Sequence, residues 1–257
     1  MRIITFNANG IRSAQRKGFF DWFYQQEADV LCLQETKAQE YQLPEDLFNN
    51  GGYRRYFFDA DKPGYSGVAI YTRRSPDAVQ KGLGFPLCDT EGRYLEIAFA
   101  KLRIASLYLP SGSSGEARQA LKFEFMRSYQ DILAKQLKSG HDYIICGDFN
   151  IVHQRIDIKN WASNQNSSGC LPEERAWLDL LFKEQGWVDA FRVLNQEPDQ
   201  YTWWSERARA WHKNVGWRID YQIVTPNLKD KIAKVAIYRE QKFSDHAPVI
   251  IDYDIMP

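Results

Sequence analysis

Residues 242–255, KFSDHAPVIIDYDI, join an acidic and imidazole pair to an apolar run near the end of the chain. Asp245 and His246 come directly before 247–253, a short stretch rich in Val and Ile that predicts a buried strand. A histidine beside a carboxylate is a common way to orient an imidazole, although a polar turn that only caps the strand would have the same sequence. The stretch therefore predicts a core strand that starts at a polar rim.

Short apolar runs of the same kind alternate with helical patterns along the chain. Apolar residues recur at helical spacing over 121–137 and stop before Gly140, and Pro172 can open a second helix. Adjacent runs such as 94–99 and 102–109 are joined tightly, so hairpins must occur and a purely parallel sheet is excluded. We expect an α/β fold in which two mixed sheets pack together with helices outside. The expected strands are 2–6, 30–34, 67–72, 94–99, 102–109, 143–147, 219–224 and 247–253.

Composition limits the class of protein. A chain of 257 residues with 44% hydrophobic residues can bury a large core, and we expect one domain over 1–257. The chain has 33 lysine and arginine residues and 33 aspartate and glutamate residues, so its net charge does not favour a polyanionic partner such as nucleic acid. Any polyanion must therefore bind through a local group of positive charges. The four cysteines lack C-x-x-C spacing, and the sequence has neither a signal peptide nor a run of 18 apolar residues. We expect a soluble, cytoplasmic monomer with no membrane partner.

Polar residues recur where the expected strands end. In stacked sheets those ends lie along one rim, so residues far apart in sequence can converge on one pocket. The set is rich in oxygen, with one imidazole and no thiolate, which suits Mg²⁺ or Mn²⁺ and the handling of phosphates. Each residue alone could equally be a cap, a turn or a packing group, and only their joint occurrence favours a site. The set comprises Asn7, Asn9, Gln34, Glu35, Tyr108, Asp148, Asn150, Asp220, Asp245 and His246.

Eight motifs resemble, in order, those of the exonuclease III family of abasic-site endonucleases. The resemblance covers nearly the whole chain and lies within the wider endonuclease/exonuclease/phosphatase superfamily. SDH and GDFN are shared across that superfamily, whereas LQETK, LPEER and GWRIDY are more particular to its DNA-repair branch. The motifs are NANG at 7–10, LQETK at 33–37, GYSGVA at 64–69, SLYLPSG at 106–112, CGDFNI at 146–151, LPEER at 171–175, GWRIDY at 216–221 and SDHAP at 244–248.

The resemblance implies a four-layer α/β sandwich and a Mg²⁺-dependent hydrolase, with Mn²⁺ as a substitute cation. Its substrate would be double-stranded DNA with abasic sites or blocked 3′ ends. It would be incised 5′ to the lesion, with 3′ phosphatase, 3′ phosphodiesterase and 3′→5′ exonuclease as companion activities. Whether Asp148 or a metal-bound hydroxide is the general base stays open, as does the choice of one or two metals. The resemblance assigns catalysis to Asp148, His246, Tyr108, Asn150, Asp220 and Asn7, and metal binding to Glu35, Asn9 and Asp245.

Substrate binding is assigned in the same way. The resemblance makes Trp203, Trp217 and Ile219 the walls of a small apolar pocket for a flipped, base-free sugar. It also gives Arg175 of LPEER and Arg12 after NANG to DNA binding. The alternatives are that the aromatic residues are core and that the cationic residues are a solvated surface.

Two other functions fit the same sequence. One is a phosphoesterase of the same superfamily acting on lipid head groups or inositol phosphates. The other is a non-catalytic DNA-binding module, which is disfavoured because every expected polar position is occupied.

Overall fold

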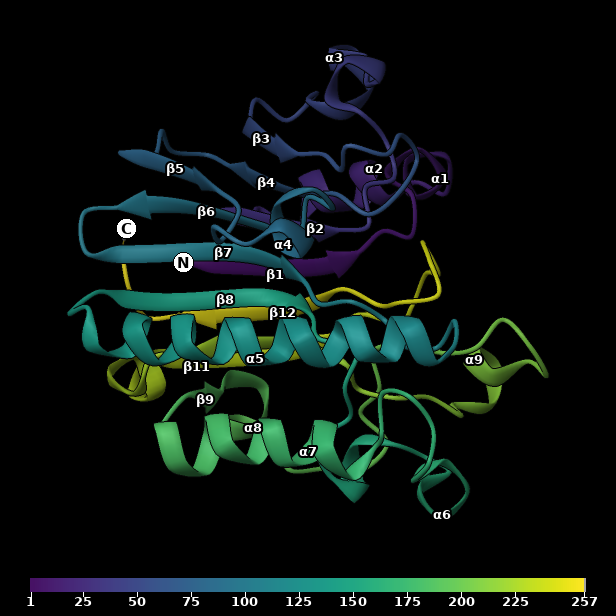
Figure 1. The fold of residues 1–257 in the computed structure, drawn as a ribbon. Coiled ribbons are helices and arrows are strands. Elements are labelled where there is room, and N and C mark those ends of the chain that lie inside the picture. The colour runs from purple at the N-terminus through teal and green to yellow at the C-terminus, as the bar shows by residue number, and fades with distance from the viewer. Residues whose placement is uncertain (257) are drawn as a thin grey trace.

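The computed structural model describes residues 1–256 as two six-stranded sheets packed face to face between layers of helices (Figure 1). The strand orders are β11-β12-β1-β2-β4-β3 in the first sheet and β5-β6-β7-β8-β10-β9 in the second. The strands are β1 (Arg2–Asn7), β2 (Val30–Gln34), β3 (Arg54–Phe58), β4 (Val68–Thr72), β5 (Ala78–Lys81), β6 (Tyr94–Phe99), β7 (Leu102–Tyr108), β8 (Asp142–Asp148), β9 (Val188–Asp189), β10 (Asp220–Val224), β11 (Ile232–Ile237) and β12 (Val249–Tyr253).

Both sheets are mixed, because each combines hairpins with one parallel pair. Strand β1 runs parallel to β2 and antiparallel to β12, and β7 runs parallel to β8 while β10 is antiparallel to β8. The central strands are buried on both faces, which explains their unbroken apolar sequences. The arrowheads of β1, β7 and β8 point toward the same side of the molecule, to the right in Figure 1. The polar residues that follow these strands therefore meet at one rim.

Helices cover the two outer faces of the sandwich. Aromatic residues of α2, among them Phe19 and Phe23, pack on the outer face of the first sheet. Phe125 of α5 and Trp177 of α7 belong to the core on the outer face of the second sheet. The α-helices are α1 (Ile11–Arg16), α2 (Phe19–Gln25), α3 (Glu45–Phe48), α4 (Pro86–Asp89), α5 (Glu116–Lys138), α6 (Trp161–Asn164), α7 (Pro172–Asp179), α8 (Ala190–Leu194) and α9 (Ala210–Lys213). The other helical segments are η1 (Glu40–Gln42), η2 (Arg155–Asp157), the π-helical η3 (Leu180–Gln185) and η4 (Pro226–Lys231).

The predicted fold is confirmed. The eight expected strands are all present, and so are the helices expected over 121–137 and from Pro172. Strands β3, β5, β9 and β11 were not expected. They lie at or next to the sheet edges, and β5 is exposed at every residue, so the apolar pattern that marks a core strand is missing there.

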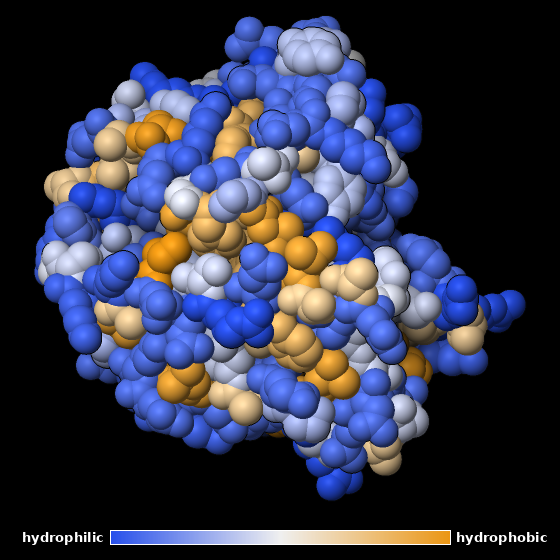
Figure 2. Space-filling view, viewed as in Figure 1, coloured by the Kyte–Doolittle hydropathy of each residue, from blue (hydrophilic) through white to orange (hydrophobic). Residues whose placement is uncertain are grey.

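Little apolar surface remains outside the core. The face in Figure 2 is mostly hydrophilic, with hydrophobic residues gathered near its middle around α4. The four cysteines are all buried and free, as their positions in apolar runs predict. No helix within residues 1–256 has both the length and the apolar character needed to cross a membrane. Among the side chains that the structure describes, the exposed large hydrophobic ones are Tyr41, Val79, Leu194 and Met256.

Candidate active site

Strand register brings the predicted polar residues of the second sheet together. Asp148, the last residue of β8, is paired with Tyr108 of β7 on one side and with Asp220 of β10 on the other. In the first sheet, Asn7 ends β1 beside Gln34 of β2, and Glu35 follows directly. Five strand ends, with the turn before β12, thus form one rim shared by both sheets.

Asn7 links the two sheets at this rim. Its side chain is completely buried, and its Nδ2 donates to Glu35 Oε1 at 2.8 Å and to Asp148 Oδ2 at 2.8 Å. Its Oδ1 accepts from the backbone N–H of Asn9 at 2.9 Å. Because a buried amide is stable only when its hydrogen bonds are made, Asn7 fixes the separation of the two carboxylates.

His246 is held by Asp220. The imidazole Nδ1 lies 2.9 Å from Asp220 Oδ2, and Nε2 lies 3.9 Å from Asp148 Oδ2. An ionised carboxylate can only accept a hydrogen bond, so Nδ1 carries a proton and Nε2 faces the site. Burial lowers the pKa of His246, but the charges of Asp220, Asp148 and Asp245 outweigh it and raise the pKa to about 10. The imidazole is therefore cationic at neutral pH.

Asp148 lies in the centre of this group and is only 1% exposed. Burial, together with the nearby charges of Asp220 and Glu35, raises the pKa of Asp148 to about 8 against the opposing effect of His246. The backbone N–H of Asn150 donates to Asp148 Oδ1 at 2.8 Å, and Asn150 Nδ2 lies 3.2 Å from Oδ2. A carboxylate of this basicity can accept a proton near neutral pH.

The predicted metal residues lie on the solvent side of the same rim. Asn9 Nδ2 donates to Asp245 Oδ1 at 2.9 Å, and Trp203 Nε1 donates to Asp245 Oδ2 at 3.1 Å. Lys37, the last residue of LQETK, was not expected at the site. Its Nζ lies 2.7 Å from Glu35 Oε2 and 2.5 Å from Asn9 Oδ1. An ammonium group therefore bridges two predicted metal residues.

The residues present fit a divalent cation. Ligand atoms of Glu35, Asp148 and His246 all lie within 4.8 Å of one another. Asp220 Oδ1 is buried and accepts no hydrogen bond from the described residues. A mainly carboxylate set with a single imidazole suits a hard ion such as Mg²⁺ or Mn²⁺. The structure thus supports a metal centre at this rim. Of these three residues the resemblance assigns only Glu35 to metal binding, together with Asn9 and Asp245, whereas it assigns Asp148 and His246 to catalysis.

Tyr108 lies at the border of the site, and its ring packs against Arg93, a residue that the sequence patterns did not indicate. Burial raises the pKa of Tyr108 well above its ordinary value, and the charge of Glu35 acts in the same direction. The Arg93 guanidinium lies 4.6 Å from the centre of the Tyr108 ring, and Arg93 Nη1 donates to the Tyr108 carbonyl at 2.9 Å. Tyr108 is therefore a protonated, fixed donor at neutral pH.

The three predicted pocket walls lie together next to His246. The rings of Trp203 and Trp217 are 5.7 Å apart at 80°, and both pack against a small cluster that contains Ile219. Trp203 also forms isolated bridges with Trp217 and with His246. The neighbouring Trp204, by contrast, is fully buried in another cluster. The other members of the pocket cluster are Val152, Ile158 and Cys170, with Trp161 packed against them.

The two predicted DNA-binding arginines have different surroundings. Arg175 lies 4.7 Å from the centre of the Trp161 ring, and its Nη1 donates to the carbonyl of Cys170, so it is fixed at the edge of the pocket cluster. Trp161 was not expected there. Arg12 is exposed on α1, two residues after the turn that contains Asn9. A contact of Arg12 with DNA stays a prediction.

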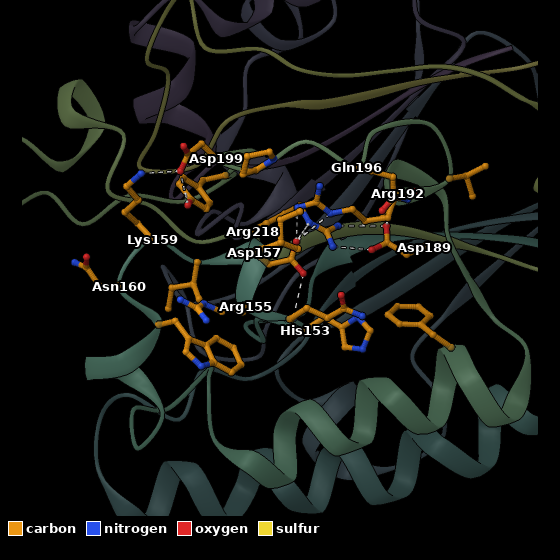
Figure 3. A pocket seen from close by; sticks show the side chains of 18 of the residues that line it. His153, Arg155, Asp157, Lys159, Asn160, Asp189, Arg192, Gln196, Asp199 and Arg218 are labelled. Atoms are coloured by element: carbon orange, nitrogen blue, oxygen red, sulfur yellow. Dashed lines mark hydrogen bonds and ion pairs between the residues drawn. The ribbon is translucent and has the colours of Figure 1, made fainter.

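A cavity of about 1360 Å³ with a mixed polar and apolar lining adjoins Ile158 and Trp161 of the pocket cluster (Figure 3). Arg218, between Trp217 and Ile219 in sequence, points into a buried network there: its Nε donates to Asp157 Oδ1 at 2.7 Å and its Nη2 to Asp189 Oδ2 at 2.7 Å. Arg192 Nη2 donates to the same Asp157 oxygen at 2.7 Å. Two cations and two carboxylates balance, so the network acts as a cross-link behind the pocket.

We expect Asp157→Asn to lower the free energy of unfolding at pH 7 by about 3–5 kcal/mol, because two buried guanidinium groups lose their shared partner. Burial opposes ionisation, but Arg218 and Arg192 prevail and lower the pKa of Asp157. A lowered carboxyl pKa stabilises the protein above the unfolded pKa of about 4, and this contribution is lost as pH falls. Urea unfolding should therefore show a smaller difference between wild type and variant at about pH 2.5, below the unfolded pKa, than at pH 7.

Asp199→Asn is the matched control. Asp199 lines the same cavity, but its ion pair with Lys159 is half exposed and should contribute little. Equal losses for the two variants would contradict a structural role for the buried network.

An acidic and imidazole cluster at the common rim of a four-layer sandwich defines a metal-dependent phosphoesterase. The chain belongs to the Endonuclease/Exonuclease/phosphatase family, whose model matches residues 4–246. It is 36% identical to an exodeoxyribonuclease of Bacillus subtilis over 254 residues, which cover 97% of this chain and 98% of the relative. It is 35% identical to the DNA repair nuclease APEX1 of Danio rerio over 98% of this chain and 81% of the relative. The predicted family and hydrolytic enzyme class are confirmed.

A solved structure shows the same architecture. An AP endonuclease from Archaeoglobus fulgidus superimposes with a TM-score of 0.89 at 25% identity, covering 99% of this chain and 100% of that one. The likeness extends over both sheets and their helices, so the rim described above lies within a shared fold.

Proposed function

We propose that this protein is a DNA repair nuclease that incises double-stranded DNA on the 5′ side of abasic sites with the aid of Mg²⁺. The observation that carries the proposal is the apolar cluster of Trp203, Trp217 and Ile219, which the Trp203–His246 bridge places directly beside the catalytic cluster. The relatives support it, since they include an exodeoxyribonuclease, a DNA repair nuclease and an AP endonuclease.

The division of labour follows from the geometry. Glu35, with Asp148 within reach, would hold the cation, which when bound offsets the charge of the phosphodiester. Asp148 orients the attacking water and accepts its proton, and Asn150 holds that carboxylate through its backbone N–H. His246, cationic and held by Asp220, donates from Nε2 to a phosphate oxygen. Asn7 keeps the two sheets' carboxylates in register, and Tyr108 donates to the phosphate.

Selectivity for a base-free sugar follows from the pocket walls. The two indole rings and the isoleucine side chain of this cluster would offer apolar contact to a flipped deoxyribose rather than hydrogen bonds to a base. An abasic nucleotide is also cheap to extrude, because no base pair must be broken. Arg175 and Arg12 supply positive charge near the rim for the DNA backbone. Removal of 3′ phosphate and 3′→5′ exonuclease activity are proposed companions at the same metal centre.

A duplex with a single tetrahydrofuran abasic analogue tests the proposal. Incubation with Mg²⁺ should give one nick on the 5′ side of the lesion, and EDTA should abolish it; Mn²⁺ should substitute for Mg²⁺. Binding without cutting would favour a non-catalytic module. Hydrolysis of inositol phosphates or lipid head groups, with an untouched duplex, would favour the other phosphoesterase.

We expect Trp217→Ala to reduce kcat/KM for abasic incision by about 10–100-fold while 3′ phosphatase activity falls much less, because a terminal phosphate does not need the sugar pocket. Parallel assays on the abasic duplex and on a 3′-phosphate primer measure the difference. Trp211→Ala is the control, since Trp211 packs in the separate Trp204 cluster. A uniform loss on both substrates would make Trp217 a structural residue only.

A further inference from the structure

Lys122 is a completely buried lysine next to the catalytic loop. It lies on α5, and its side chain, like that of Glu174 on α7, is 0% exposed. Lys122 Nζ and Glu174 Oε1 are 2.5 Å apart. An ammonium group is rarely removed from water without a partner, because its desolvation costs several kcal/mol. The pair therefore requires an explanation beyond surface solvation.

The second partner of Lys122 is a backbone atom of the active site. Lys122 Nζ donates to the Asn150 carbonyl at 2.7 Å. Asn150 has φ 52°, in the left-handed region, which costs a residue with a side chain about 1 kcal/mol. Its N–H donates to Asp148 Oδ1 at 2.8 Å, and its Nδ2 donates to the Leu109 carbonyl at 2.9 Å. A charge-assisted hydrogen bond thus fixes the strained turn that aims Asp148.

Glu174 connects the same turn to α7. Its Oε2 accepts from the Leu171 backbone N–H at 3.0 Å, and its Oε1 also accepts from Gln119 Nε2 at 3.1 Å. Gly169 closes the other side: a Cβ on this residue would lie 3.0 Å from the Asn150 carbonyl and 3.0 Å from the Trp217 ring. The Asn150 carbonyl is therefore enclosed by Lys122 and by the segment that packs on the pocket wall.

We infer that Lys122 is a positioning residue for hydrolysis, acting through the Asn150 carbonyl to hold Asp148 and Asn150 in attacking geometry, with Glu174 as its charge partner. The inference rests on the proposed function. If the ion pair had a purely structural role, the Lys122 ammonium would need no hydrogen-bond acceptors beyond Glu174 and groups of its own helix. Here the Lys122 ammonium instead donates one hydrogen bond to the carbonyl of Asn150, two residues after the catalytic Asp148.

The test compares Lys122→Met/Glu174→Gln with wild type. Replacing both charges avoids an unpaired buried ion, so we expect a folded protein with a similar unfolding temperature. We expect kcat on the abasic duplex at saturating Mg²⁺ to fall about 10–100-fold and KM to change less than about threefold, as for the loss of a supporting hydrogen bond behind a metal site. Should that double variant unfold, Lys122→Gln/Glu174→Gln, which pairs two neutral polar side chains and has a shorter donor at position 122, carries the same expectation.

Two controls separate positioning from stability. Glu174→Gln keeps the Lys122 donor and should retain most of the wild-type kcat per folded molecule, even if it unfolds at lower temperature. Lys135→Met changes an exposed lysine of the same helix and should have no effect. A folded double variant with wild-type kcat, or an equal loss in Glu174→Gln, overturns the inference. Failure of the wild type to nick the duplex would instead overturn the proposed function.

Discussion

Asp148→Asn should lower kcat for abasic incision by about 10³-fold while the Kd for the abasic duplex changes less than about threefold. The amide nearly matches the carboxylate in shape, and its Oδ1 can still accept from the Asn150 backbone N–H, so the turn and the pocket persist although the bond from Asn7 Nδ2 is lost. It cannot take a proton from water, and the loss of a general base costs about 10²–10⁴-fold in rate. Single-turnover incision at saturating Mg²⁺ measures the chemical step, and fluorescence anisotropy measures affinity.

The matched control is Asp142→Asn, at the opposite end of β8. Asp142 forms a surface pair with Lys101 and begins the seven-residue strand that Asp148 ends. It should leave kcat unchanged. A variant at position 148 that turns over like wild type would remove Asp148 from the reaction, and a loss of affinity equal to the loss of rate would make it a binding group instead.

Metal-free Asp148→Asn should also be more stable than wild type at pH 8. The raised pKa of Asp148 means that folding favours its protonated form, so the ionised carboxylate costs stability that grows as pH rises from the unfolded value of about 4 toward about 8. Without its cation, such a site lowers the free energy of unfolding. Active sites commonly reduce stability in this way because activity requires their charged groups.

Strand patterns predict the rim well because strand ends are local features. Asp148, Tyr108 and Asp220 each end or begin an apolar run, and the sheet register then places them side by side. The sequence gives no reason to expect the partners that come from elsewhere. Lys37 lies in a loop, and Arg93 lies just before the expected strand 94–99, at a polar position that its apolar pattern does not mark.

Long-range polar pairs escape prediction for a different reason. Lys122 lies on a helix where a lysine is ordinarily solvent-exposed, and Glu174 reads as an acidic residue in the first turn of α7. Arg218 and Asp157 are 61 residues apart and meet only when the loop before α6 folds against β10. Burial decides these roles, and burial of a charged residue depends on partners that no local pattern specifies.

Asp220→Asn should lower kcat by about 10²–10⁴-fold, because His246 loses the carboxylate that sets its tautomer and stabilises its positive charge. Asp220 is the main group that raises the pKa of His246 against the effect of burial. Below the unfolded pKa of about 6.5 a raised histidine pKa gives its full stabilisation, which is lost as pH rises through the folded value of about 10. With Asn at position 220 the folded pKa falls, so His246 becomes neutral at lower pH.

The alkaline limb of the kcat profile should therefore move to lower pH in Asp220→Asn, and the stability lost relative to wild type should be largest in acid. Rates between pH 6 and 10 at saturating Mg²⁺, with urea unfolding of the metal-free proteins, measure both effects. Asp230→Asn, at an exposed position beyond the same strand, is the control and should change neither. A uniform fall in rate with an unmoved alkaline limb would show that Asp220 acts on the reaction by a route other than His246. Because Asp220 Oδ1 is buried and unpaired among the described side chains, direct contact with the cation or the leaving oxygen would then be that route.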